Sequence, residues 1–221
     1  MKKILIVAPH ADDEVLGVGG TMARNIAEGN DVYVCVVTHG EEPLFSKEIT
    51  EKLRQETLQA HRHVGIKKTY FLEYPAVMLE NVPRYELNNS IMKVVEEVQP
   101  DEVYLPHKGD MQKDHQIVSE AVMVAVRPKY EHKIHAVYAY ETLSETEWNI
   151  PNTGNAFIPT VYKDISDYLK CKKEMLGYFT TQLANFPNPR SIEAVEALAS
   201  YRGSTIGVRA AEAFVLIREI L

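Results

Sequence analysis

The sequence predicts an α/β fold, a three-layer α/β/α sandwich built around a mostly parallel, Rossmann-like sheet. Two observations support this prediction. Lys3–Ala8 is a continuous apolar run rich in β-branched residues, which is typical of a strand covered on both faces. Predicted strands then alternate with amphipathic helices as far as Tyr140, and that alternation is typical of a parallel sheet with helices on both sides.

Local signals define the individual elements of this alternating part. Leu16–Glu28 predicts a helix, and Asp31–Thr38 predicts a second buried strand. Ser46 is a suitable N-cap for a helix over Lys47–Val64, and Gly65 is a suitable residue to end it. The further elements are expected at Lys68–Leu72 (strand), Tyr85–Val98 (helix), Glu102–Leu105 (strand), His115–Val126 (helix) and Lys133–Tyr140 (strand).

The last third of the sequence is less regular. It contains no repeat, low-complexity stretch or linker, so we expect a single domain over residues 1–221. Glu141–Pro159 is expected to be a loop, and Ala213–Ile217 is either a terminal strand or a helix. Between them the pattern predicts a strand at Val161–Ile165 and helices at Ser166–Phe179 and Ser191–Tyr201.

Composition excludes several classes of protein. The 221 residues are 45% hydrophobic, which suits one globular domain. A formal net charge of −7, from 24 basic and 31 acidic side chains, argues against a nucleic-acid-binding surface. No apolar run reaches the ~18 residues that a membrane span needs. Two cysteines, Cys35 and Cys171, give neither a disulfide framework nor a metal motif, so a cytoplasmic location is the simplest expectation.

The loop after the first strand is where a ligand is expected, since open α/β sheets bind ligands beyond the carboxyl ends of their strands. One interpretation is a dinucleotide site, because Gly17, Gly19 and Gly20 follow the strand. The third glycine of that fingerprint would fall at Met22, however, and the acidic run Asp12–Glu14 would repel a pyrophosphate. We therefore reject a nucleotide site.

The acidic run favours a metal site instead. Adjacent carboxylates at the end of a buried strand repel one another unless a cation or hydrogen bonds compensate them. His10 lies three residues before Asp13, so a tight loop can direct both side chains to one zinc-like centre. A third ligand is expected after the Glu102–Leu105 strand, where His107 and His115 compete. We favour His115 because it opens a helix and has a more rigid position.

These motifs resemble those of a known family. His10–Glu14 (HADDE) resembles the H-P-D-D-E motif of the LmbE/PIG-L-like family of zinc-dependent de-N-acetylases, and Asp110–His115 is similar to its D-x-H-x-D-H segment. The resemblance covers the whole chain and implies an LmbE-like deacetylase domain. Further similarities are Leu16-Gly17, Gly19-Gly20, Thr38–Glu41, Arg54, Glu56, Pro100-Asp101, Gly207 and Ala211–Phe214.

The resemblance implies roles for individual residues. His10, Asp13 and His115 would bind Zn²⁺, with another divalent transition metal as the alternative. Asp12 would be the general base. Asp114 would be a catalytic residue that acts from outside the ligand set. Three protein ligands leave an open coordination position, as in catalytic rather than structural zinc sites.

One departure from the family pattern affects the chemistry. Gln112 stands where the family commonly has a histidine that stabilises the oxyanion or protonates the leaving amine. Gln112 can donate a hydrogen bond but cannot deliver a proton. His107 is therefore a candidate substitute at the substrate, and Asp12 is a candidate carrier of the proton. The resemblance also implies that Arg54 binds substrate.

The implied function is a metal-dependent hydrolase that removes the acetyl group from an N-acetylated amino sugar or sugar conjugate, with a possible homo-oligomer. Two alternatives stay open: a metal-containing sugar-binding protein without hydrolysis, and a hydrolase of a non-sugar amide. Glu14 is expected to hold the loop or cap the first helix. Arg190 is either a charge clamp for substrate or the neighbour of a helix start, and His61 is expected to be an ordinary surface or hydrogen-bonded residue.

Overall fold

The structure is a computed structural model that describes residues 1–129 and 132–221. Within these residues the strands are β1 (Lys3–Ala8), β2 (Asp31–His39), β3 (Lys68–Pro75), β4 (Glu102–Pro106), β5 (Ala136–Tyr140), β6 (Val161–Asp164) and β7 (Ala211–Glu219). The described strands form one seven-stranded sheet in the order β3-β2-β1-β4-β5-β7-β6.

The sheet is mostly parallel, as the sequence predicted. Strands β1 to β5 run in the same direction, whereas β7 is antiparallel to both β5 and β6. The chain moves outward from β1 to β2 and β3 on one side and resumes with β4 on the other. The strand order therefore reverses between β1 and β4, and this is the topological switch point at which such sheets bind ligands.

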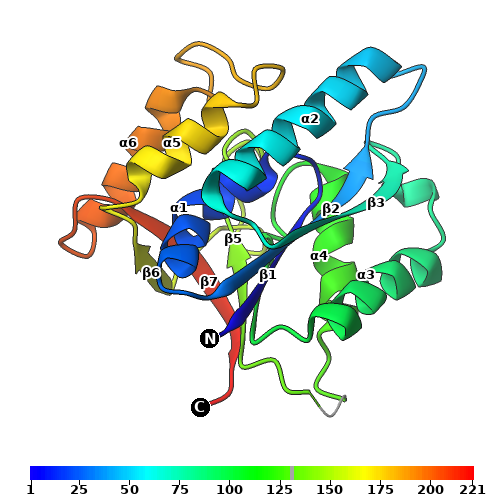
Figure 1. Ribbon diagram of the computed structural model, residues 1–221, viewed down its shortest axis with the longest axis horizontal. Coiled ribbons are helices and arrows are strands. Elements are labelled where there is room, and N and C mark those ends of the chain that lie inside the picture. The colour runs from blue at the N-terminus through cyan, green and yellow to red at the C-terminus, as the bar shows by residue number, and fades with distance from the viewer. Residues whose placement is uncertain (130–131) are drawn as a thin grey trace.

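Helices cover both faces of the sheet (Figure 1). Helices α1 (Asp13–Ala27), α2 (Lys47–Val64), α5 (Leu169–Gly177) and α6 (Ile192–Ser204) lie on one face, and α3 (Arg84–Val98) and α4 (Lys113–Ala125) lie on the other. A short 3₁₀ turn, η1 (Leu79–Asn81), packs against α4. The three-layer α/β/α prediction is confirmed.

Strand β1 shows why its sequence is apolar throughout. Ile4 and Ile6 belong to the core under α1, α5 and α6, while Leu5 and Val7 belong to the core under α3 and α4. Each of these four side chains is at most 1% exposed. The strand is thus buried on both faces, and its carboxyl end is fixed in the middle of the sheet.

Several element boundaries differ from the sequence-based ones for local reasons. Helix α1 begins at Asp13 rather than Leu16, because Asp13 and Glu14 occupy its first turn, where acidic residues are favourable. Strand β3 continues past Leu72 to Pro75 through a register shift against β2. The terminal segment is a strand over Ala211–Glu219.

The glycines of the first helix serve packing, which supports the rejection of the nucleotide site. A Cβ on Gly17 would lie 2.3 Å from Cδ2 of Tyr140, and a Cβ on Gly20 would lie 2.6 Å from Cδ1 of Ile165. Such distances are far below van der Waals contact, so only glycine lets β5 and the loop after β6 approach α1 this closely.

A buried ion pair joins α1 to the C-terminal third. The carboxylate of Glu212 on β7 accepts hydrogen bonds from the Gly20 and Thr21 N–H groups at 2.8 and 2.7 Å. It also pairs with Lys172 on α5 at 2.6 Å, and the same ammonium donates to the Leu16 carbonyl at 2.8 Å. The network is satisfied on both sides, so it fixes α5 and β7 against α1.

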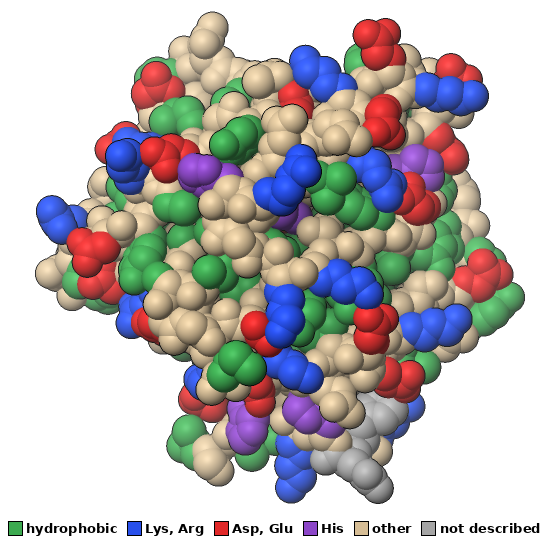
Figure 2. Space-filling model, in the orientation of Figure 1, with side chains coloured by type: hydrophobic (Ala, Val, Ile, Leu, Met, Phe, Trp, Pro, Cys, Tyr) green, Lys and Arg blue, Asp and Glu red, His purple; other side chains and the backbone are tan. Residues whose placement is uncertain are grey.

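The surface carries charges of both signs. On the face drawn in Figure 2, acidic and basic side chains are interspersed among apolar ones rather than gathered into one patch. Among the helices of residues 1–129 and 132–221, none has the length and apolar character needed to cross a membrane.

Candidate metal centre

The carboxyl ends of β1 and β4 bring the two sequence motifs together at the switch point. His10 and Asp13 follow β1 directly, and His115 lies in the first turn of α4, which follows β4. One ligand atom from each of the three side chains lies within 4.8 Å of the others. The structure therefore brings together the three residues that the sequence proposed as metal ligands.

The two histidines share one carboxylate. Oδ2 of Asp13 lies 3.2 Å from Nδ1 of His10 and 3.2 Å from Nε2 of His115. The other ring nitrogen of each histidine contacts a further carboxylate, His10 with Asp114 at 3.0 Å and His115 with Asp110 at 2.9 Å. With the outer nitrogen of each ring bound to a carboxylate, the inner nitrogen is the one that faces Asp13 and that would bind a metal once it is deprotonated, as in metal-binding histidines.

The outer carboxylates are themselves held in place. Asp114 accepts hydrogen bonds from the Val77 N–H at 2.6 Å and from the Leu79 N–H at 3.3 Å. Asp110 accepts one from the Thr146 hydroxyl at 2.6 Å. Both imidazole rings are thus oriented by groups that have little freedom to move. Asp114, which the sequence placed in the catalytic group, contacts His10.

Asp12 is held in an unusual conformation next to this cluster. It is the N-cap of α1, and its φ of 103° lies in the left-handed region that is unfavourable for an L residue. Its N–H donates to Glu14 at 3.1 Å, and its Oδ2 accepts from Arg190 at 2.7 Å. Its Oδ1 is buried and has no hydrogen-bond partner among the described residues.

Glu14 completes the run of buried carboxylates. It is fully buried, and its carboxylate lies 3.0 Å from Nε2 of His61 on α2. The other nitrogen of His61 lies 2.7 Å from the Thr69 hydroxyl on β3. Glu14 therefore holds the loop through the Asp12 N–H, and His61 is a buried hydrogen-bonded residue.

The electrostatics of the centre favour a bound cation. Burial raises the pKa of Asp12 to about 8, against the opposing effect of the Arg190 guanidinium. Burial also acts to raise the pKa of Asp13, but the His115 and His10 imidazoles outweigh it and hold that pKa well below its usual range. Burial acts to lower the pKa of His115, yet Asp13 and Asp110 raise it to about 10. The carboxylates thus stabilise positive charge between the rings.

These residues fit a divalent metal. Two imidazoles and one carboxylate are the donor set of many catalytic zinc sites, whose ligands lie about 2.0–2.2 Å from the ion. Oδ1 of Asp13 and Nε2 of His115 are buried, and neither has a hydrogen-bond partner in the described part of the chain. Buried polar atoms without partners are costly, and a metal ion would satisfy them.

A cavity of about 230 Å³ lies beside the centre, and its lining includes His10, Gln112 and Arg190. Gln112 is the N-cap residue of α4, and its side-chain oxygen is buried without a partner among residues 1–129 and 132–221. His107 is not among the residues that line this cavity. Its Nε2 is hydrogen-bonded to the Asn155 carbonyl at 3.1 Å, so the structure does not bring it to the centre as a substitute for Gln112.

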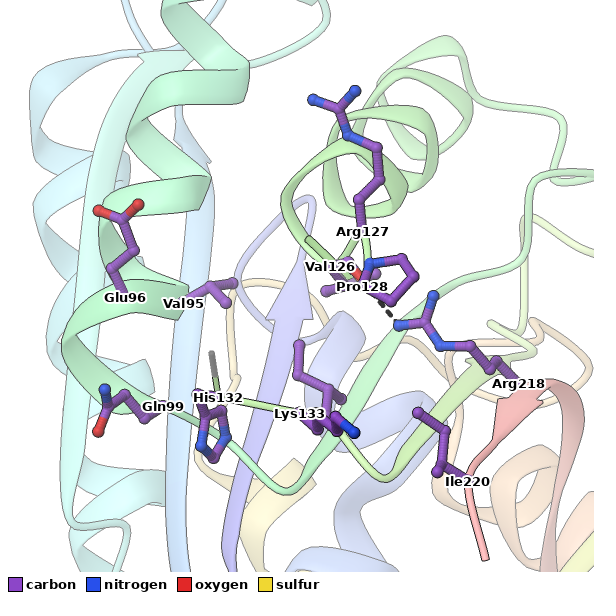
Figure 3. A pocket seen from close by; sticks show the side chains of 11 residues that line it. Val95, Glu96, Gln99, Val126, Arg127, Pro128, His132, Lys133, Arg218 and Ile220 are labelled. Atoms are coloured by element: carbon purple, nitrogen blue, oxygen red, sulfur yellow. Dashed lines mark hydrogen bonds between the residues drawn. The ribbon is translucent and has the colours of Figure 1, made fainter. Parts of the chain in front are cut away.

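A larger cavity, of about 510 Å³, lies near the amino ends of the parallel strands, and Figure 3 shows the side chains that line it. It is formed by the ends of α3 and α4, the segment before β5 and the end of β7. The Arg218 guanidinium there donates to the Val126 carbonyl at 2.6 Å. Because it faces the amino ends of the parallel strands, this cavity is remote from the switch point and contains none of the predicted site residues.

Three features of the centre do not follow from the sequence patterns. The sequence does not decide the role of Arg190, which contacts Asp12 from 178 positions further along the chain. Asp110 belongs to a recognised motif, but only its spacing before His115 could indicate its contact with that residue. His61 carried no signal, because its contact with Glu14 depends on how α2 packs against α1.

The fold and the centre together define a Rossmann-like protein that can hold a divalent metal at its switch point. The profile of the PIG-L family, described as GlcNAc-PI de-N-acetylase, matches residues 5–126. That match covers more than half of the chain and includes every predicted metal ligand. The chain therefore belongs to the PIG-L family.

Individual relatives agree with this assignment. The chain is 29% identical to a probable N-acetyl-alpha-D-glucosaminyl L-malate deacetylase 2 of Bacillus anthracis, over 83% of this chain and 82% of that protein. It is 24% identical to the diacetylchitobiose deacetylase of Thermococcus kodakarensis, over 96% and 82%. The crystal structure of the conserved protein TT1542 from Thermus thermophilus superposes with a TM-score of 0.82 and 27% identity, covering 100% and 97% of the two chains.

Metal binding should stabilise the protein through this centre. Adding Zn²⁺ to metal-free protein should raise its unfolding temperature, since a ligand at 100 times its Kd adds about 2.7 kcal/mol. His10→Ala should abolish the shift, and Asp114→Asn should weaken zinc affinity about 10- to 100-fold. Thermal unfolding and zinc content by mass spectrometry measure both effects.

The matched control for Asp114→Asn is Asp167→Asn, which removes an exposed carboxylate paired with Arg209. It should bind zinc like the parent. Equal zinc affinity in the parent and in His10→Ala would contradict the assignment of this centre.

Proposed function

We propose that this protein is a metal-dependent deacetylase that hydrolyses the acetamide of an N-acetylated amino sugar or sugar conjugate. One observation carries the proposal: a His–Asp–His cluster backed by outer carboxylates lies next to a second buried carboxylate, Asp12, that has one free oxygen. The names of the Bacillus anthracis and Thermococcus kodakarensis relatives support the reaction class, since one is a probable N-acetyl-alpha-D-glucosaminyl L-malate deacetylase and the other a diacetylchitobiose deacetylase.

His10, Asp13 and His115 are the residues that would hold the metal, with zinc as the first candidate. When bound there, a divalent ion supplies Lewis-acid polarisation of the amide carbonyl and lowers the pKa of water. Asp110 and Asp114 keep both imidazoles in the tautomer that presents the inner nitrogen.

Asp12 is the proposed general base. Arg190 holds one oxygen of Asp12. Oδ1 of the ionised carboxylate, which has no partner among the described residues, can then accept a proton from the attacking water. The water oxygen forms a bond to the acetyl carbon, and Asp12 takes the proton. The C–N bond then breaks, and the proton passes from Asp12 to the departing nitrogen. The products are acetic acid and the free amino sugar, and the acid then loses its proton to the amine or to solvent to give acetate.

In the pattern that the sequence resembles, a histidine at position 112 stabilises the oxyanion or protonates the leaving amine. We propose that Gln112 takes the first role and Asp12 the second. The Gln112 amide lies in the cavity wall with His10, where its NH₂ can donate a hydrogen bond to the oxyanion. An amide cannot deliver a proton, and His107 is occupied by the Asn155 carbonyl. We therefore assign both proton transfers to Asp12.

Asp12→Asn should keep the fold and the metal while losing most turnover. Asparagine has nearly the same shape and can still accept the hydrogen bond from Arg190, but it cannot take up the proton. Loss of a general base typically costs about 10²- to 10⁴-fold in rate. Acetate release from a panel of N-acetyl sugars measures the effect, and zinc content confirms an intact centre.

Hydrolysis by Asp12→Asn at the parent rate would show that Asp12 is not the base. If the zinc-loaded parent releases no acetate from any member of the panel, the chain is a metal-containing sugar-binding protein or acts on a non-sugar amide. N-acetylated amines outside sugar chemistry distinguish these two outcomes.

Arg190 is proposed as the positioning residue for Asp12. Its guanidinium also donates to Ser144 at 2.8 Å and lies 3.8 Å from both Asp13 and Glu145. Arg190→Ala should lower kcat about 100-fold, because the Asp12 carboxylate would no longer be held within hydrogen-bonding reach of the attacking water. KM should change less, and added guanidinium ion at low millimolar concentration should restore part of kcat.

Arg209→Ala, which removes an exposed guanidinium, is the control and should match the parent in kcat. An Arg190→Ala variant with parental kcat would contradict the positioning role. A loss of kcat that guanidinium does not rescue would assign Arg190 a merely structural role.

A further inference from the structure

We propose that the protein selects its substrates by charge, and that Glu73 is the residue that determines this specificity. A cavity adjoining the centre accepts an uncharged, hydroxyl-rich group, such as a second sugar, and disfavours phosphate or carboxylate. This inference rests on the proposed function and specifies the substrate class for the same site.

The adjoining cavity has a volume of about 480 Å³ and borders the one beside His10. A substrate whose acetamide lies at His10 would extend its remaining part toward this second cavity. The two cavities share six lining residues, Ala11, Thr38, His39, Gly40, Thr50 and Leu53.

Arg54 lies in the wall of the second cavity, but its charge is already matched. Its guanidinium donates a hydrogen bond to the Glu73 carboxylate and lies 4.2 Å above the ring of Phe71. A free guanidinium is the preferred partner of phosphate and carboxylate, because its fork of N–H groups binds two oxygens at once. An acidic group of a substrate could bind Arg54 only by displacing the Glu73 carboxylate.

The backbone of β3 directs Glu73 toward Arg54. The pairing of β3 with β2 shifts register between Val36 and Thr38, opposite Phe71 and Tyr74, which places Glu73 in a bulge. Glu73 has a φ of 60°, a conformation that is costly for a residue other than glycine or asparagine. Bulges near binding sites commonly redirect a side chain. Here the carboxylate reaches Arg54 and lies 3.6 Å from Nδ1 of His39.

The other charged residues that line the second cavity are also mainly acidic. Four glutamates, Glu41, Glu42, Glu51 and Glu73, line the cavity, against two permanent cations, Lys47 and Arg54. This excess of negative charge repels an acidic ligand, whereas carboxylates accept hydrogen bonds from sugar hydroxyls. Apolar side chains also line the same cavity, namely Val36, Leu53 and Phe71, although the Arg54 guanidinium covers one face of the Phe71 ring.

Steady-state kinetics on two substrates test the proposal. The zinc-loaded parent should hydrolyse neutral N,N′-diacetylchitobiose with a higher kcat/KM than N-acetylglucosamine 1-phosphate. Glu73→Gln should raise the ratio of phosphate to neutral kcat/KM about fivefold, mainly through KM, as expected for one partly exposed charge interaction. Glu97→Gln, which removes the carboxylate of an exposed pair with Lys68, is the matched control and should leave the ratio unchanged.

Salt dependence gives a second readout on the unmodified protein. Raising the ionic strength should reduce the parent's preference for the neutral substrate, because screening weakens interactions between exposed charges. A preference for the phosphate substrate in the parent, or an unchanged ratio in both Glu73→Gln and high salt, would overturn the proposal.

Binding measurements separate this inference from the proposed function. Calorimetric titration of Asp12→Asn with the same two compounds reports selection by charge without any turnover. If the parent releases no acetate from either compound, the proposed function fails for these substrates. The binding ratio, and its change when Glu73→Gln is added, then still supports or overturns the role of Glu73.

Discussion

The structure depends on the compensation of three consecutive buried carboxylates. Asp12, Asp13 and Glu14 are each at most 1% exposed, and burial of an unpaired charge costs several kcal/mol. Each carboxylate meets its cation or hydrogen-bond donor on a different element, at distances of 2.7 to 3.2 Å. The partners are Arg190 before α6 for Asp12, His115 on α4 for Asp13, and His61 on α2 for Glu14. These contacts tie the two helical layers and the C-terminal third to the end of β1, so the proposed chemistry and the packing of the sheet share the same residues.

The last third of the chain contributes to the centre, although the match to the family profile ends at residue 126. The Lys172–Glu212 pair anchors α5 and β7 to α1, and Arg190 then reaches Asp12 from the segment between α5 and α6. A strained Asp12 persists because Arg190 and Glu14 hold it from two sides. The free oxygen of Asp12 therefore results from a network spread over the whole chain.

Local sequence patterns were sufficient for the fold and for part of the centre. Apolar runs and helical periodicity are local signals, and the short spacing from His10 to Asp13, with His115 at the next strand end, follows from the switch-point rule. Arg190 and His61 could not be assigned because their partners lie far away in the sequence and are set by tertiary packing. Glu73 was missed for another reason: its positive φ lacks the glycine or asparagine that normally indicates such a turn.

The position of a bound metal ion decides whether His10, Asp13 and His115 form the metal centre. Crystals grown with zinc and measured on both sides of the zinc absorption edge would locate the ion by anomalous scattering. We expect one strong peak between Nδ1 of His10, an oxygen of Asp13 and Nε2 of His115, with Asp12 close by but still paired with Arg190. Absence of a peak at this position, or a peak bound by Asp12 in place of Asp13, would show that the ligand assignment is wrong.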